Sequence, residues 1–102
     1  MRESDEAARL RALALVHLAA GRALESDEAL RELSEQHAEE SACLIADVHA
    51  ARGDVDAAFE WLERAFRQRD GELAFVKADP RFRSLYADPR WDAFLRKMGL
   101  AG

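Results

Sequence analysis

Apolar residues recur along most of the chain at intervals of three and four positions, which is the spacing of one face of an α-helix. Serine or aspartate followed by acidic residues marks expected helix starts, and glycine marks expected stops. Ser26 and Asp54 are interpreted in this way as N-terminal caps. The pattern predicts four helices: about 5–20, about 27–37, from 42 to a stop at 53, and from 55 to a stop near 70–71.

The last third of the chain contains two near-copies of one motif, Asp-Pro-Arg-aromatic, at 79–82 and 88–91. Aspartate caps a helix, proline suits its first turn, and the aromatic residue then enters the core one turn later. After a helical turn or two around 73–76, the first copy predicts a short helix that ends near Tyr86. The second copy predicts a longer helix that ends at Gly99.

The amino-acid composition favours helices over strands. The 102 residues include no threonine, one isoleucine and four valines, and these β-branched residues are the ones that strands favour. We therefore expect an all-α protein.

The charge and the chain ends limit the classes of partner. A net charge of −5 and a pI of about 5.2 argue against nucleic acid, because proteins that bind it usually carry a basic surface. The charged N-terminus lacks the apolar segment of a secretory signal, and no apolar run is long enough to cross a bilayer. Cys43 is the single cysteine, so no disulfide can form within the chain. We expect a cytoplasmic protein without a membrane partner.

The first and third predicted helices have matching apolar positions when their terminal glycines, Gly21 and Gly53, are aligned. Gly21 and Gly53 are 32 positions apart, and we call this spacing the repeat offset. In the second helix of each copy, Ala29 matches Ala58 when three extra residues are allowed in the first connection. The pairs matched in the first helices are Leu13 with Ile45, Ala14 with Ala46, and His17 with His49.

Residues 39–70 resemble a tetratricopeptide repeat (TPR), a helical hairpin whose period of about 34 residues is close to the repeat offset. Ala46 stands where the family has a small residue in its first helix, and Gly53-Asp54 resembles the turn of the family. The copy at 5–38 is weaker, because Gln36 stands where the second small residue of the second helix is expected. The small, large, small pattern of that helix is matched in the better copy by Ala58, Leu62 and Ala65.

The resemblance implies one all-α domain over 1–102, built from antiparallel helical hairpins in a right-handed array. Its parts would be a repeat at 5–38, a repeat at 39–70 and a helical cap at 71–100, which resembles the C-terminal end of TPR arrays in bacterial multidomain regulatory proteins. Stacked repeats bury their apolar faces against one another. Two repeats and a cap therefore imply a piece of a longer array or an association between copies, such as a homodimer.

The sequence offers no pattern typical of an enzyme. His17, His37 and His49 show no spacing of metal ligands, and no glycine-rich phosphate loop is present. His17 and His49 are interpreted instead as helix-packing residues. Paired carboxylates fit capping and solvated faces better than acid–base catalysis. We expect no catalytic residue, no cofactor and no metal.

In TPR domains the first helices of the repeats form a concave face that binds peptides. The resemblance therefore implies a non-catalytic interaction module with a protein or peptide partner, whose direction Arg11 and Asp47 would set. Leu15, Asp47 and Cys43 replace the asparagine and lysine residues that hold a terminal carboxylate in some members, which argues against that ligand. The predicted partner-binding residues are Ala8, Arg11, Leu15, Leu18, Glu40, Cys43, Asp47 and Ala50.

Two alternatives stay open at this stage. The same face could pack on neighbouring helices or on a second chain, which would make the protein a structural end-piece of an array or a homodimerisation domain without a separate ligand. Trp61 could pack beneath the cap or anchor an interface, where large aromatic residues are enriched.

Overall fold

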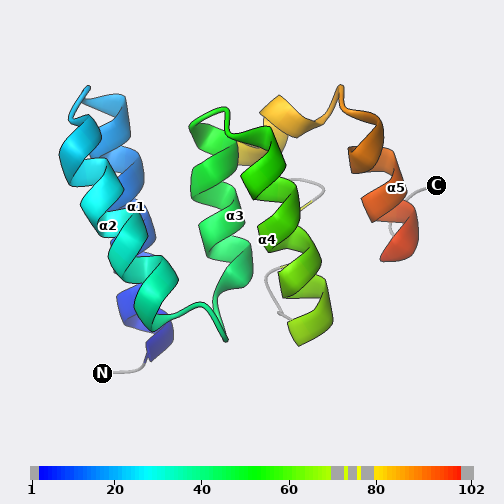
Figure 1. Ribbon diagram of the computed structural model, residues 1–102, viewed down its shortest axis with the longest axis horizontal. Coiled ribbons are helices and arrows are strands. Elements are labelled where there is room, and N and C mark those ends of the chain that lie inside the picture. The colour runs from blue at the N-terminus through cyan, green and yellow to red at the C-terminus, as the bar shows by residue number, and fades with distance from the viewer. Residues whose placement is uncertain (1–2, 70–72, 74–75, 77–79, 100–102) are drawn as a thin grey trace.

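A computed structural model describes residues 3–69, 73, 76 and 80–99, and these residues form an all-helical protein of packed helix pairs (Figure 1). The predicted all-α class is therefore confirmed for the described part of the chain. The predicted stop at 70–71 and the predicted cap at Asp79 lie outside the described residues. The elements are α1 (Glu3–Ala19), α2 (Ala23–Gln36), α3 (Ala42–Ala51), α4 (Val55–Gln68), the 3-10 helix η2 (Pro80–Leu85) and α5 (Pro89–Lys97).

The helices form two antiparallel hairpins followed by a shorter C-terminal pair. α1 packs chiefly against α2, and α3 packs chiefly against α4. η2 lies against α3, and α5 runs beside α4 in the same direction (Figure 1). None of the described helices combines the length and the apolar character needed to cross a bilayer.

The boundaries of the two hairpins correspond closely. The end of α3 follows the end of α1 by the repeat offset. Both ends of α4 follow the corresponding ends of α2 by the same offset. Gly21 and Gly53 occupy the same place in the two connections and share a φ of +78°, a left-handed conformation that side chains with a Cβ rarely adopt. The two connections therefore have the same length, and the predicted three extra residues in the first connection are wrong.

The predicted cap at Ser26 is also wrong. α2 begins at Ala23, so Ser26 lies inside the helix, where it is fully buried and its Oγ donates a hydrogen bond to the Ala14 carbonyl at 2.8 Å. Ser26 is thus the residue equivalent to Ala58 by the repeat offset, a place that the sequence alignment had given to Ala29. The reason is tertiary packing. A small side chain is needed where α2 lies close to α1, and the buried hydroxyl of Ser26 has a hydrogen-bond acceptor there.

The core consists of two buried clusters. The first joins residues of α1 and α2 to Ile45 and Val48 of α3. The second joins α3 and α4 to the C-terminal segment, from which Phe82, Phe94 and other apolar residues are buried. Half-buried Trp61 packs against both clusters. The outer side of the second hairpin is therefore covered by η2 and α5.

Local caps position α5 as the sequence predicts. The Asp88 carboxylate accepts a hydrogen bond from the Arg90 backbone N–H at 2.9 Å, and Pro89 occupies the first turn. Gly99 follows the helix with a φ of +77°. Two ion pairs, Arg90 with Asp56 and Lys97 with Glu63, then join α5 to α4.

Candidate interaction faces

The eight predicted partner-binding residues lie on α1, on α3 and just before α3, and we refer to them as the α1–α3 face. The α1 part is accessible: Ala8 is exposed, and Arg11, Leu15 and Leu18 are half-buried. The α3 part is not, because Cys43, Asp47 and Ala50 are buried, whereas Glu40 before it is exposed. A ligand on this face would therefore touch α1 more than α3.

Arg11 and Asp47 are brought together by the packing of α1 on α3. Nη1 of Arg11 donates to Oδ2 of Asp47 at 3.0 Å, and the side chains are 24% and 3% exposed. Burying a carboxylate is costly unless a positive charge and hydrogen bonds compensate it. The two residues predicted to orient a ligand thus pair with each other.

The C-terminal segment contacts the far end of the same face. Oγ of Ser84 in η2 donates to the Ala50 carbonyl at 2.8 Å. Cys43 and Ala50 belong to the same buried cluster as Val76 and Phe82. These α3 residues are therefore part of the core that η2 completes, and the side chain of Cys43 is buried in it.

His37 is a buried titratable group whose surroundings the sequence did not predict. Its Nδ1 lies 3.0 Å from Oε1 of Glu40, and its Nε2 lies 3.5 Å from Oε1 of Glu6 on α1. Burial lowers the pKa of His37, but hydrogen bonds and charges from Glu40 and Glu6 outweigh burial, so the pKa is raised. The i,i+3 spacing of His37 and Glu40 was the only local signal for this cluster.

His49 is perturbed in the opposite direction. Burial lowers its pKa, and the nearby Asp54 carboxylate, 3.5 Å from Nδ1, offsets this only in part. His49 lies half-buried near the end of α3, with its Nδ1 toward Asp54 in the α3–α4 turn. Among the described residues, no group of three or more histidine, cysteine and acidic side chains is placed to hold a metal ion.

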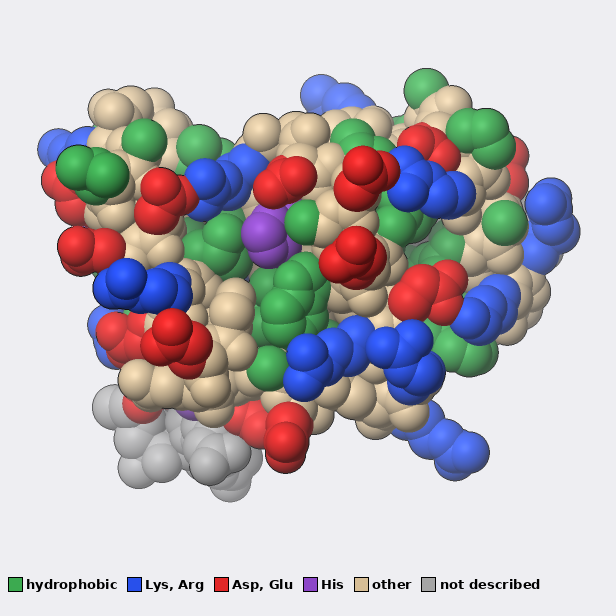
Figure 2. Space-filling model, viewed as in Figure 1, with side chains coloured by type: hydrophobic (Ala, Val, Ile, Leu, Met, Phe, Trp, Pro, Cys, Tyr) green, Lys and Arg blue, Asp and Glu red, His purple; other side chains and the backbone are tan. Residues whose placement is uncertain are grey.

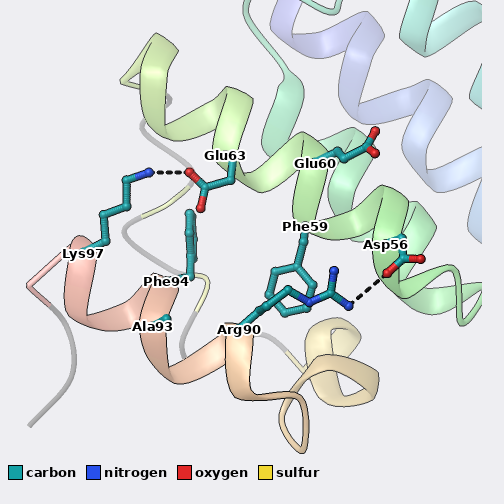
Figure 3. A pocket seen from close by; sticks show the side chains of 8 residues that line it. All are labelled: Asp56, Phe59, Glu60, Glu63, Arg90, Ala93, Phe94 and Lys97. Carbon is teal, nitrogen blue, oxygen red and sulfur yellow. Dashed lines mark hydrogen bonds and ion pairs between the residues drawn. The ribbon is translucent and has the colours of Figure 1, made fainter.

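A groove between α4 and α5 is a further surface that the sequence did not reveal (Figure 3). It encloses about 470 Å³ and is lined by the rings of Phe59 and Phe94. Arg90 reaches across it to Asp56 at 2.9 Å, with its guanidinium 4.6 Å from the centre of the Phe59 ring. These contacts attach α5 to α4, which is a structural role.

The surface over α2 and α4 mixes both signs of charge. Figure 2 shows acidic and basic side chains interspersed over these helices, with apolar side chains visible between them. In addition to the pair of Arg11 and Asp47, an ion pair between Arg52 at the end of α3 and Asp27 on α2 joins the two hairpins.

Comparison with models of protein families, with curated protein sequences and with solved structures finds no match for this chain.

Proposed function

We propose that the protein is a non-catalytic protein interaction module, built as a short TPR-like array of helical hairpins. The shared offset between the boundaries of the first two hairpins supports this interpretation. A slightly longer offset extends it to the C-terminal pair: α5 starts at Pro89 where α4 starts at Val55, and η2 ends at Leu85 where α3 ends at Ala51. On this interpretation η2 and α5 are a shortened third hairpin that closes the array.

We propose that a peptide or a partner helix binds along the α1 side of the α1–α3 face. The observation that carries this proposal is the accessible stripe of Ala8, Arg11, Leu15 and Leu18, which lie three and four positions apart on one side of α1. Asp47 holds the Arg11 guanidinium in place through one nitrogen. The Nε of Arg11 is buried, so an acceptor on a ligand would have to use the Nη donors of this side chain, which is 24% exposed.

Selection from a random peptide library tests the proposal. Peptides selected on the wild-type protein should bind Leu18→Glu at least about tenfold more weakly, because a charge in an apolar contact is costly. Val16→Glu is the matched control, since Val16 lies on the same helix but off this stripe and is 59% exposed. Equal binding to all three proteins, or selection of no peptide, would contradict peptide binding at this face.

A structural end-piece of an array is the second candidate function. The covered outer side of the second hairpin favours it, because η2 and α5 leave little apolar surface of α4 open at that end. Light scattering over a concentration series tests a related form of it, a homodimerisation domain. A dimer whose mass does not change when peptide is added would favour this candidate, and a monomer that binds peptide would favour the first.

A further inference from the structure

The outer face of the first hairpin is the side of α1 and α2 that is turned away from α3. Arg11 points to α3 through its bond to Asp47, and Leu13 lies two positions later, about 200° around the helix. We define the outer face by Leu13 and Val16 of α1, Ala29 of α2 and three glutamates of α2 described below. Leu13 and Ala29 line a shallow pocket of about 240 Å³, and Val16 is 59% exposed.

Residues equivalent to this apolar centre are buried between the two hairpins. By the repeat offset, Ile45 and Val48 are the equivalents of Leu13 and Val16, and both are fully buried in the cluster that contains the α1 and α2 core residues. Trp61, the equivalent of Ala29, packs against the same cluster. The second hairpin therefore docks on the first through positions whose equivalents in the first hairpin are also apolar. Of these equivalents, Val16 is exposed, Leu13 is half-buried, and Ala29 is buried with 9% of its surface exposed. This equivalence indicates that the outer face is shaped to receive a helix.

The rim of the outer face is acidic. Glu25, Glu28 and Glu32 recur at three and four positions, so they form one row along α2, and all three line the pocket and are exposed. Within the described part of the chain, none of them forms an ion pair. Arg9 is the one lysine or arginine that lines the same pocket. By contrast, Asp27 of α2, which lies at the junction between the two hairpins, forms an ion pair with Arg52.

We propose that the outer face binds a basic amphipathic helix of another protein. Apolar residues of that helix would lie on Leu13, Val16 and Ala29, and its lysines or arginines would lie opposite the glutamate row, as amphipathic helices bind in acidic apolar grooves. A second copy of this chain, docked through the same face, would bring a second glutamate row close to the first, and like charges repel. This surface is separate from the α1–α3 face, so either interaction can exist without the other.

Titration with two synthetic helical peptides tests the proposal on the full chain. Both peptides carry isoleucine and valine at three-and-four spacing, and they differ only in having lysine or glutamate along one flank. Calorimetry should show the lysine peptide binding at least about tenfold more tightly, with an affinity that falls as salt rises. The triple variant Glu25→Gln, Glu28→Gln, Glu32→Gln should weaken lysine-peptide binding about tenfold. Val16→Glu should weaken binding of the apolar part of the peptide, and Leu18→Glu, on the other side of α1, should leave binding unchanged.

Three results would overturn the proposal. Equal affinity for the two peptides would remove the charge argument, and unchanged binding in both the triple variant and Val16→Glu would place any binding elsewhere. A concentration-dependent dimer that Val16→Glu dissociates would show that a second copy covers the face. All the substituted positions except Leu18 are exposed, and a circular dichroism melt of each variant separates loss of binding from loss of folding.

Discussion

Arg11 of α1 and Asp47 of α3 are 36 positions apart in sequence and form an ion pair of 3.0 Å with the carboxylate almost completely buried. This pair joins the first helices of the two hairpins at the centre of the α1–α3 face. Loss of this ion pair should therefore change the relative placement of the two hairpins and lower the stability of the protein.

Arg11→Ala should lower the free energy of unfolding by about 2 kcal/mol, because it removes a cation from a buried carboxylate while Arg11 itself is partly exposed. The double variant Arg11→Ala, Asp47→Ala should be less destabilised than the sum of the single variants. A double-mutant cycle measured by urea denaturation gives the coupling. Additive effects would mean that the pair contributes nothing to stability.

Ser26→Ala should destabilise the protein by about 1 kcal/mol, because it removes the buried hydroxyl that donates a hydrogen bond to the Ala14 carbonyl of the neighbouring helix. Ser34→Ala is the matched control. Ser34 is half-buried, and its Oγ bonds to the Leu30 carbonyl within its own helix, so its removal should cost less. Denaturation of both variants compares the two, and a larger loss from Ser34→Ala would contradict the packing role of Ser26.

His37 should make the protein less stable as the pH rises from about 6 to 8. Its pKa is raised in the folded state, so its contribution is complete below the unfolded value of about 6.5 and is lost as the pH rises through the folded value. Urea denaturation at a series of pH values should show this loss, and His37→Gln should remove it.

His49 should have the opposite effect, because its pKa is lowered in the folded state. The unfolded chain then binds the proton more readily, so stability falls as the pH drops through about 6.5. His49→Gln should reduce this loss at acidic pH. A pH profile unchanged by either histidine substitution would show that neither group is coupled to folding.

Asp88→Ala should destabilise the C-terminal helix by about 1 kcal/mol, because its carboxylate caps the Arg90 backbone N–H. Asp54→Ala is the control. Asp54 also precedes a helix, α4, but makes no side-chain capping bond there, so the effect should be smaller. Hydrogen exchange of the first-turn amides of α5 would locate the change, and unaltered exchange in Asp88→Ala would contradict the capping role.

Local signals in the sequence predicted the helices well. The apolar spacing placed α1, α3 and α4 to within about two residues, and the Asp-Pro start and the glycine stop placed α5. The apolar spacing, the caps and the stops each involve residues within about one helical turn. The bounds of a helix can therefore be predicted from its own segment of the sequence. Ser26 shows where this fails, since serine followed by acids is typical of a cap although packing against α1 placed it inside a helix.

The sequence by itself determined that the chain is helical and which residues recur on each apolar face. Only the tertiary structure decided that Arg11 pairs with Asp47, that His37 lies between Glu6 and Glu40, and that the C-terminal segment helps to bury Cys43 and Ala50. The physical reason is that, apart from the local pair of His37 and Glu40, these contacts join segments that are far apart in the sequence. The energies of these contacts depend on burial and on distances across the fold, and neither can be predicted from the spacing of residues along one helix.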